Sequence, residues 1–348
     1  MSSRRLWVDE VQPGMKLAAS IVLHNQILAE NNSIVTAELI ARLKNHAEIL
    51  TVLVEEPPIK RPLTTWERSV RQTYEKTIGK VKHIFDNARE TGQIQMNEVV
   101  ALTSDTVIEL LKQDFALQTL KNLNSHDEYT YHHSLNVGVL CGVLGRWLKY
   151  DNDLLFMLVL AGILHDTGKS QIPLSVLNKP AKLTAEEMGI MRRHAVLGYD
   201  MIKNIPAIPE DVKMAVLQHH EKADGTGYPF GVRENKINDF AKIVAVADIY
   251  DAVTSNRVYQ KARSPFSVIE IIEEEMFLRL DSKICLPMLS KIRNTLVGRQ
   301  VITQDGRRAK IIFINQQIES KEMVLQTEDG EMISLSMKDY KHFRDYIG

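Results

Sequence analysis

The chain is poor in cysteine and has no hydrophobic run long enough to cross a membrane. Its two cysteines, Cys141 and Cys285, lie far apart, and neither has the CxxC partner of a redox or zinc motif. The longest apolar run, Leu154 to Leu164, is shorter than a bilayer-spanning helix. The N-terminus lacks the charged and then apolar segments of a signal peptide. These absences predict a cytoplasmic protein with reduced thiols and no membrane insertion.

An excess of charge of either sign is also missing. The chain carries 43 Lys and Arg against 44 Asp and Glu, for a formal net charge of −1. No global field therefore attracts nucleic acid or an anionic membrane, and we expect no nucleic acid partner. Any recognition of phosphate must come from local side chains.

At 348 residues the chain is long for a single core, which favours two or three domains. Residues 1–56 are predicted to form a small α/β domain, with a strand-like stretch at Ile21–Ala29, a helix over Ala37–His46 and a β-branched stretch at Leu50–Val54. The prolines in the segment 57–64 indicate a stiff linker.

The rest of the chain divides by the period of its apolar residues. Spacings of three and four predict connecting helices at 65–124 and a helical domain at 125–296. A period of two, with turn signals at two Asp-Gly pairs, predicts a small β domain at 297–348. The predicted fold class is mainly α, with a central all-helical bundle between a small N-terminal α/β domain and a small C-terminal β domain.

Histidines are concentrated in one part of the helical domain and are accompanied by carboxylates. Seven of the 11 histidines fall between residues 126 and 220. Imidazole and carboxylate together suit iron, manganese, zinc and similar divalent cations, while the absence of cysteine ligands argues against a structural zinc site. The clustering therefore indicates a metal centre.

The central element is the segment His165-Asp166-Thr167-Gly168-Lys169, which follows an apolar helix. Neighbouring helical residues point about 100° apart, so His165 and Asp166 could serve adjacent metals, with the carboxylate bridging them. Lys169 would return to the same face, where its ammonium could neutralise a phosphate oxygen. Taken alone, a His-Asp pair also fits a plain helix-terminal turn.

Two further motifs follow along the chain. The segment His219-His220-Glu221 closes another helix, and consecutive imidazoles at a helix end are seldom explained by core packing. The segment 224–229, with the sequence DGTGYP, has two glycines that permit close approach of the backbone. In isolation this segment is also a plain turn, but its position directly after the histidines makes it specific.

The ordered motifs HDTGK, HHE, DGTGYP and ADIYDAVTSNRVY resemble the HD-GYP family, the cyclic di-GMP phosphodiesterase branch of the HD-domain hydrolases. The similarity covers roughly residues 125–290 and implies an HD-type helical bundle. It also implies a metal-dependent phosphodiesterase that hydrolyses cyclic di-GMP to linear pGpG, with further cleavage to GMP left open.

The resemblance implies two divalent metal ions that share Asp166 as a bridge. The implied ligands are His133, His165, Asp166 and Asp248 for one ion and Asp166, His194, His219 and His220 for the other. Iron and manganese come first among the candidate ions, with zinc, nickel, cobalt and magnesium as alternatives. Asp248 lies in an apolar stretch where an unpaired carboxylate would be costly, and a metal would satisfy it.

The resemblance also assigns catalytic and substrate-binding roles. A hydroxide held between the two metals is expected to attack the phosphodiester, with Lys169 stabilising the developing charge and Asp127 handling a proton. The residues expected to bind the substrate are Asp224, Gly225, Gly227, Tyr228, Arg257 and Lys261.

The chain departs from the family pattern at two positions. Tyr129 stands four residues before the first histidine ligand, where members with three metals carry glutamate, so two metals are expected rather than three. Gln260 stands where members often have lysine, which removes one phosphate contact, although Arg257 remains. His126 and His132 are interpreted as residues that bind no metal.

Two other functions stay open at this point. One is an HD-domain nucleotide phosphohydrolase of other specificity, against which the DGTGYP segment argues. The other is a non-catalytic cyclic-dinucleotide sensor, against which the complete set of ligands argues. A homodimer formed through the helix predicted at Thr64–Ala88 is a further hypothesis, the alternative being that its apolar stripe packs within the chain.

Overall fold

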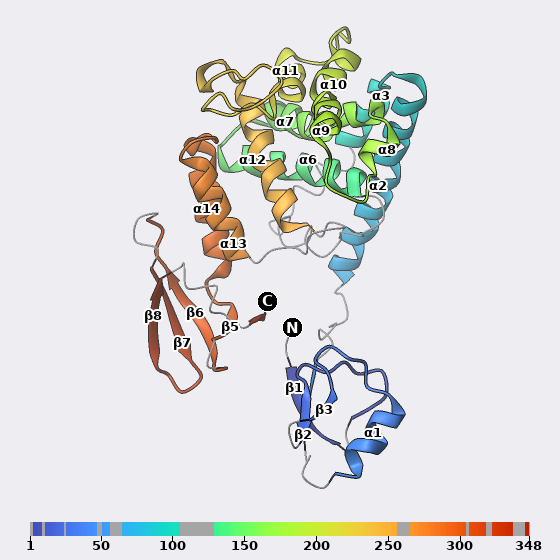
Figure 1. Cartoon of the computed structure of the whole chain (residues 1–348). Coiled ribbons are helices and arrows are strands. Elements are labelled where there is room, and N and C mark those ends of the chain that lie inside the picture. The colour runs from blue at the N-terminus through green and yellow to red at the C-terminus, as the bar shows by residue number, and fades with distance from the viewer. Residues whose placement is uncertain are drawn as a thin grey trace. The chain divides into compact units, whose positions relative to one another are not determined.

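The computed structural model describes residues 3–8, 11–23, 26–46, 51–55, 65–104, 129–255, 265–303, 306–317, 322–336 and 345–347. A helical body over Thr64–Leu296, together with residues 315–321, forms one compact unit of the chain (Figure 1). Among the described helices, none has both the length and the hydropathy needed to cross a membrane. The predicted linker at 57–64 lies outside the described residues.

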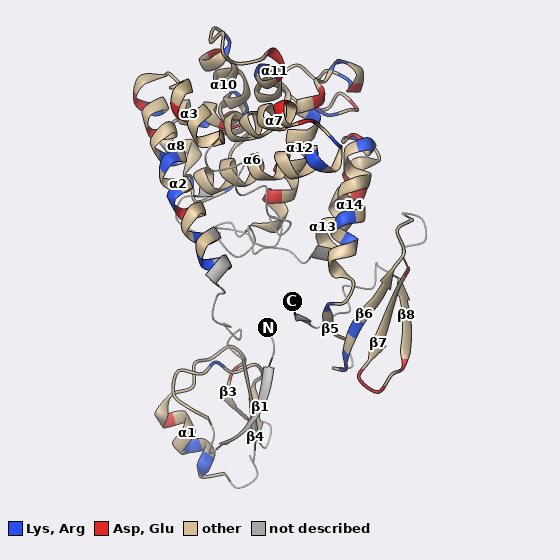
Figure 2. Cartoon of the chain, turned by 180° about the vertical axis from the view of Figure 1, so that it is seen from behind, with Lys and Arg blue, Asp and Glu red and all other residues tan. Residues whose placement is uncertain are grey.

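The helical body confirms the mainly α class that the spacing of apolar residues predicted. Its α-helices are α2 Thr65–Thr91, α3 Met96–Leu102, α6 Tyr129–Trp147, α7 Asn152–Leu164, α8 Leu174–Leu177, α9 Ala185–Arg192, α10 His194–Ile202, α11 Glu210–Gln218, α12 Asp239–Thr254, α13 Pro265–Met276 and α14 Ser282–Leu296. Acidic and basic residues are interspersed along the helices in Figure 2, in keeping with the small net charge.

The centre of the body is the pair α6 and α7, which pack against each other more extensively than any other described pair of helices. Every residue of α7 from Leu158 to Leu164 is buried, so this helix is covered on all sides by its neighbours. Because α7 ends inside the body, the polar residues that follow it are held in the interior. The rings of His133 on α6 and His165 after α7 are 5.2 Å apart between centroids.

A 3₁₀ turn over Thr167–Gln171 follows and packs against the start of α10. Gly168 makes this approach feasible, since a Cβ atom there would lie 2.0 Å from the carbonyl oxygen of His194. The contact brings the first residue of α10 beside the residues that follow α7. Three segments that are distant in the sequence therefore meet at one point.

Helix α2 packs within the body. Its apolar residues Ile78, Val81, Ile84 and Phe85 are buried, and it contacts α6 and the 3₁₀ turn. At these positions the apolar stripe belongs to the core of this chain, as the intramolecular alternative predicted.

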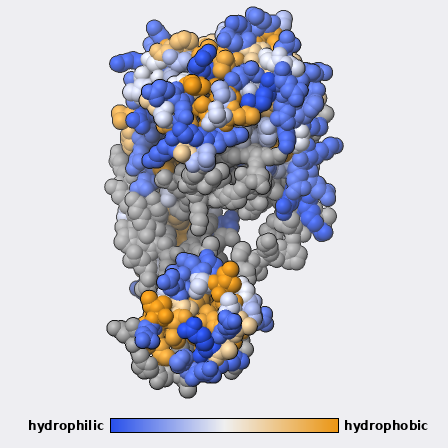
Figure 3. Space-filling view, turned by 45° about the vertical axis from the view of Figure 1, so that its right-hand side comes forward, coloured by the Kyte–Doolittle hydropathy of each residue, from blue (hydrophilic) through white to orange (hydrophobic). Residues whose placement is uncertain are grey.

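The N-terminal unit is a small α/β structure with its own core. Strands β1 Ser3–Trp7 and β4 Thr51–Glu55 pair in antiparallel fashion, and the buried Leu39 and Leu43 of helix α1 Ala37–Lys44 share a hydrophobic core with Leu17. Figure 3 shows hydrophobic side chains among the hydrophilic ones on the surface of this unit.

The prediction of one continuous strand at Ile21–Ala29 was wrong. The structure has two strands, β2 Ile21–Leu23 and β3 Gln26–Ala29, that pair with each other in antiparallel fashion. Two strands that face each other bond mutually, whereas a single extended strand of this length would need a partner elsewhere.

The C-terminal region is a five-stranded antiparallel sheet with the strand order β8-β7-β6-β5-β9. Its strands are β5 Gln300–Ile302, β6 Arg308–Ile314, β7 Glu322–Thr327, β8 Met332–Ser336 and β9 Asp345–Ile347. Gly306 and Gly330 adopt positive φ angles of 85° and 88° at the two predicted Asp-Gly turns. Helix α14 ends at Leu296 and β5 begins at Gln300, so the change of structure falls where the change of period predicted it.

Candidate metal centre

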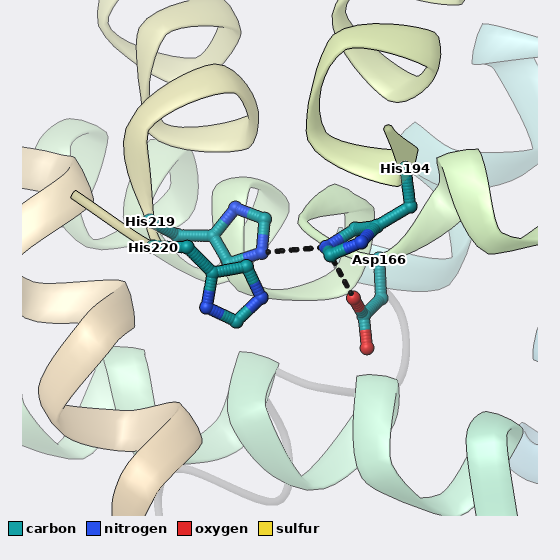
Figure 4. Close-up of side chains that lie close together, drawn as sticks. All are labelled: Asp166, His194, His219 and His220. Atoms are coloured by element: carbon teal, nitrogen blue, oxygen red, sulfur yellow. Dashed lines mark hydrogen bonds and ion pairs between the residues drawn. The ribbon is translucent and has the colours of Figure 1, made fainter. Parts of the chain in front are cut away.

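The seven histidines and aspartates that the resemblance singled out as ligands come together in the interior of the helical body. They form two groups in which one ligand atom from each residue lies within 4.8 Å of those of the others. The first donor group consists of Asp166, His194, His219 and His220, and the second donor group of His133, His165 and Asp248. Figure 4 shows the four side chains of the first donor group turned toward a common point.

Each donor is placed by the end or the interior of a particular helix. His165 is the C-cap residue of α7, and Asp166 precedes the 3₁₀ turn. His194 begins α10, and His219 is the C-cap residue of α11. The remaining donors project from the interiors of α6 and α12, apart from His220, which follows His219 directly.

Three of these histidines are oriented in the same way. The Nδ1 atom lies 2.7 Å from the carbonyl oxygen of Gly162 for His165, 2.8 Å from that of Met191 for His194, and 2.8 Å from that of Val216 for His219. A carbonyl oxygen only accepts hydrogen bonds, so Nδ1 carries the proton in each ring. Each ring therefore directs its Nε2 atom toward the other donors, as metal-binding histidines do.

The orientation leaves several buried acceptors facing one another. The Nε2 atoms of His194 and His219 are 3.2 Å apart. The Nε2 atom of His165 and the Oδ1 atom of Asp166 are buried and have no hydrogen-bond partner among the described residues. Lone pairs buried in this way are costly unless a cation or a proton lies between them. The donor set therefore fits a divalent metal ion.

The second donor group is fixed by a carboxylate that the sequence analysis did not assign. His133 lies 3.1 Å from Asp248 and 3.5 Å from Asp166 through Nε2, while its Nδ1 atom lies 2.7 Å from Oδ2 of Asp251. Asp251 also accepts hydrogen bonds from Asn136 at 2.8 Å and Ser255 at 2.9 Å. Its position three residues after Asp248, in the same apolar helix, was the signal that could have found it.

The charges around the centre divide the histidines into two classes. Burial lowers the pKa of His194 to about 4 and that of His220 to about 3, and it lowers the pKa of His219 as well. Burial also acts to lower the pKa of His133, but hydrogen bonds to Asp248 and Asp251 outweigh it and raise the pKa to about 9.

The two carboxylates among the donors stay ionised. Burial acts to raise the pKa of Asp166, but the charges of His165 and Lys169 lower it well below its ordinary value. Burial acts in the same sense on Asp248, and the hydrogen bond from His133 reverses it and lowers the pKa. Lys169 forms an ion pair with Oδ2 of Asp166, which places its ammonium at the edge of the donor groups.

The GYP loop, residues 224–229, lies beside the first donor group and is held there by a glutamate. A Cβ atom at Gly227 would lie 2.4 Å from the Cα atom of Glu221, so only glycine fits. The carboxylate of Glu221 accepts hydrogen bonds from the backbone amides of Phe230 at 2.7 Å and Val232 at 3.1 Å. Glu221 is a second residue that the sequence analysis left without a role, although it is the third letter of the HHE motif.

Tyr228 places an aromatic ring against the histidines. Its ring stacks on that of His220, with centroids 4.6 Å apart, and stands edge-on to that of His194 at 6.3 Å. The guanidinium of Arg192 lies over the Tyr228 ring, 5.3 Å from its centroid. The ring therefore closes one side of the first donor group.

Asp224 and Gly225 shape the loop. Asp224 accepts hydrogen bonds from the backbone amide and the hydroxyl of Thr226, at 2.9 and 2.6 Å, and its carboxylate lies 3.6 Å from the guanidinium of Arg279. Gly225 has a φ angle of 82°. In the structure the contacts of Asp224 stay within the loop and with Arg279, away from the donor groups.

Of the other residues named in the sequence analysis, some lie within the residues that the structure describes and some do not. The Nδ1 atom of His132 lies 3.0 Å from the hydroxyl of Tyr74, so this ring is engaged away from the donors. Asp127, Arg257 and Lys261 lie outside the described residues, as do His126 and Gln260.

Comparison with known proteins identifies the family. A family model described as HD domain matches residues 117–284. A protein of Thermotoga maritima named cyclic di-GMP phosphodiesterase is 30% identical over 299 residues, which are 80% of this chain and 78% of that protein. This chain belongs to the HD-GYP family.

Other relatives of this HD-GYP chain match it over smaller parts. A cyclic di-GMP phosphodiesterase of Pseudomonas aeruginosa is 39% identical over 194 residues, and the chain spans 47% of that protein's length. Among solved structures, an HDG"Y"P protein from Bdellovibrio bacteriovorus is 16% identical, with a TM-score of 0.53 over 84% of this chain and 99% of that one. The structural likeness supports the fold.

Proposed function

We propose that this HD-GYP chain hydrolyses cyclic di-GMP with the help of two divalent cations, one at each donor group. The observation that carries the proposal is the pair of adjacent donor groups with Asp166 between them. Its Oδ1 atom lies 3.4 Å from His194 of the first group, and its Oδ2 atom lies 3.3 Å from His165 of the second. One carboxylate thus offers an oxygen to each side, which suits a bridging ligand.

Bound metal ions would supply Lewis acidity for the activation of water and would neutralise the charge of the phosphodiester. The chain's own residues bind and orient. His165, His194 and His219 present Nε2 because their Nδ1 protons are held by backbone carbonyls. Lys169 would stabilise negative charge on the phosphate oxygens, and Asp127 would relay a proton from the attacking water to the leaving oxygen.

The substrate would lie across the rim formed by the GYP loop. We assign Tyr228, Gly225 and Gly227 to positioning the nucleotide, Arg257 and Lys261 to contacts with its phosphates, and Asp224 to the shape of the loop that presents Tyr228. The names of the Thermotoga maritima and Pseudomonas aeruginosa relatives support cyclic di-GMP as the substrate. The expected first product is linear pGpG.

The nature of the donors supports iron or manganese. Imidazole and carboxylate without thiolate suit borderline divalent cations, and both metals accept such mixed sets. Two observations support two ions: the described residues form two donor groups, and Tyr129 stands in place of glutamate in the sequence. We therefore propose two ions.

The test is turnover of cyclic di-GMP by protein loaded with Mn²⁺ or with Fe²⁺, with the products separated by chromatography. Asp166→Ala removes the shared carboxylate and is expected to lower kcat by more than about 10³-fold, the equivalent of several kcal/mol of transition-state stabilisation. The matched control is Asp200→Ala, an exposed carboxylate on α10 that pairs with Lys203, and it should leave turnover unchanged.

Three outcomes separate the alternatives. Conversion of cyclic di-GMP to pGpG that is lost in Asp166→Ala supports the proposal. Preferential hydrolysis of nucleoside triphosphates would instead identify a phosphohydrolase of other specificity. Binding of cyclic di-GMP without turnover, at full metal content, would identify a sensor.

A further inference from the structure

Helix α2, Thr65–Thr91, precedes the segment that the HD domain model matches, yet it packs against two elements that adjoin the metal centre. It packs against α6, which carries His133, and against the 3₁₀ turn, which follows Asp166. The residues of α2 that make these contacts had no role in the sequence analysis. Their hydrogen bonds lead to the second donor group.

The first contact is a chain of buried hydrogen bonds that begins at Tyr74. Its hydroxyl donates to Oδ1 of Asn136 at 2.8 Å, and the amide nitrogen of Asn136 donates to Oδ1 of Asp251 at 2.8 Å. The other oxygen of Asp251 accepts the Nδ1 proton of His133 at 2.7 Å. Three hydrogen bonds thus connect α2 to a metal-binding histidine.

The direction of each bond is determined by chemistry. Asp251 accepts from His133, so the ring of His133 has its proton on Nδ1 and directs Nε2 at the donor group. Asn136 must turn its amide nitrogen toward the carboxylate, which leaves its oxygen to accept from Tyr74. The hydroxyl of Tyr74 has one proton and gives it to Asn136, so it accepts the Nδ1 proton of His132 at 3.0 Å.

Burial makes these bonds consequential. Tyr74, Asn136 and Asp251 are all buried, so water cannot replace a lost partner at little cost. Burial and the charge of Asp251 also raise the pKa of Tyr74, which keeps its hydroxyl protonated as a donor. Without that hydroxyl the oxygen of Asn136 would lose the hydrogen bond that Tyr74 donates, and the orientation of the amide toward Asp251 would be less well defined.

A second contact holds α2 in register with the centre. The guanidinium of Arg89 donates to the carbonyl oxygens of Lys169 and Ile172, both at 3.2 Å. The side chain of Gln171 donates to the carbonyl oxygen of Ala88 at 2.7 Å. The end of α2 is therefore fixed to the turn that carries Lys169, and the position of Tyr74 relative to the donors is fixed with it.

We propose that Tyr74 is a positioning residue of the metal centre, which orients the ring of His133 through Asn136 and Asp251. The inference rests on the metal site of the proposed function and extends that site to a helix outside the HD domain model. Tyr74 touches neither metal nor substrate, and it acts through the residues between.

Tyr74→Phe tests the role with little change in side-chain volume, so the fold should be retained. The affinity for Mn²⁺ of the ion at the second donor group should fall about 10- to 100-fold, as for other groups that orient metal ligands. The ion at the first donor group should be unaffected. Calorimetric titration with Mn²⁺ measures the affinity of the chain for each of the two ions. In the same variant kcat should fall with little change in KM.

The matched control is Tyr131→Phe. The hydroxyl of Tyr131 donates to Asp86 at 2.8 Å, so it also joins α6 to α2, but this bond does not lead to a donor. Both variants lose one hydroxyl between the same two helices. Equal losses of Mn²⁺ affinity in the two variants would show a general effect on helix packing and would overturn the proposal.

A double-mutant cycle separates positioning from stability. In an Asp251→Asn background the path to His133 is already altered, so Tyr74→Phe should cause little further loss of Mn²⁺ affinity. Additive losses would overturn the proposal, as would unchanged affinity in Tyr74→Phe. Asn136→Leu breaks the same path from the other side and should reproduce the loss.

The readout is independent of turnover. If the wild-type chain binds Mn²⁺ but does not hydrolyse cyclic di-GMP, the proposed function fails, and the Mn²⁺ titrations still support or overturn the role of Tyr74. If the wild-type chain binds no Mn²⁺ at either group, both proposals fail.

Discussion

The two donor groups of the metal centre lie side by side but hold their protons differently. In the first donor group burial lowers the pKa of His194 to about 4 and that of His220 to about 3. In the second, the carboxylates of Asp248 and Asp251 overcome burial and raise the pKa of His133 to about 9. At neutral pH the first group offers imidazoles without a second proton, whereas His133 carries one that a cation must displace.

The difference shows what makes a buried histidine ready to bind metal. A carbonyl partner, as for His194 and His219, orients the ring without adding charge. A carboxylate partner, as Asp251 is for His133, orients the ring and also stabilises its protonated form until a metal takes the proton's place. We therefore expect the first donor group to bind its ion more readily at low pH.

The largest effect is expected when one group is disabled and the other is kept. His219→Asn should remove the ion of the first donor group, and His133→Asn should remove that of the second. Either change should lower kcat by about 10³-fold, because both ions contribute to transition-state stabilisation. Metal analysis by mass spectrometry should show the loss of one ion in each case. Loss of both ions from both variants would mean that the groups do not bind independently.

A smaller effect is expected at the cation that borders Asp166. Lys169→Met removes the ammonium that forms an ion pair with this carboxylate. Turnover should fall about 10²-fold, comparable to the loss of one donor that stabilises developing charge. Metal content should stay unchanged, as measured on the same preparation. A loss of metal instead would assign Lys169 to holding Asp166 rather than to the reaction.

The pH dependence of metal binding should differ between the groups. Because the pKa of His133 is about 9, binding at the second donor group should strengthen about tenfold per pH unit as the pH rises toward that value. At the first group His194 and His220 lose their second proton near pH 4 and below, so their protonation should not oppose binding between pH 6 and 8. Mn²⁺ titrations over that range measure both slopes. If the Mn²⁺ affinities of the two donor groups changed equally with pH, the proposed difference in the protonation of their histidines would be wrong.

The smallest effect is expected at the loop that borders only the first donor group. Tyr228→Leu removes the ring that stacks on His220. Since an aromatic pair contributes about 0.5–1.5 kcal/mol, kcat/KM should fall by roughly 2- to 10-fold. The content of both metals should remain as in the wild type. A large loss of metal would show that the ring supports a ligand and has no separate role toward the substrate.

The donors could be predicted from the sequence because most of them stand in compact motifs. His165 and Asp166 are adjacent, as are His219 and His220, and residues that are adjacent in the sequence remain close together in the folded chain. The spacing from Asp248 marks Asp251 as a candidate, but the sequence does not name its partner, since His133 lies 118 positions away and the bond between them exists only after α6 and α12 pack. The same holds for the contact of Tyr74 with Asn136 across 62 positions.

The fold shows a similar division. Amphipathic helices such as α2 follow from spacings of three and four. Helix α7 is instead marked by its continuous apolar run, which fits its burial on all sides. The pair β2 and β3 was predicted as one strand because the sequence between them, His24-Asn25, lacks the Asn-Gly or Asp-Gly signal of a tight hairpin. Strand β1, with the sequence SRRLW, shows no alternation of apolar and polar residues. Its place is given by pairing with β4, a long-range contact.

The bonds from histidine rings to backbone carbonyls have a consequence for the helices themselves. Gly162 and Val216 belong to the last turns of α7 and α11, where carbonyl oxygens have no amide of their own helix to accept from. The imidazole N–H fills that need, so His165 and His219 cap the helices that carry them. Substitution of either histidine would then fray a helix terminus as well as remove a metal ligand. The thermal stability of the metal-free protein would fall too.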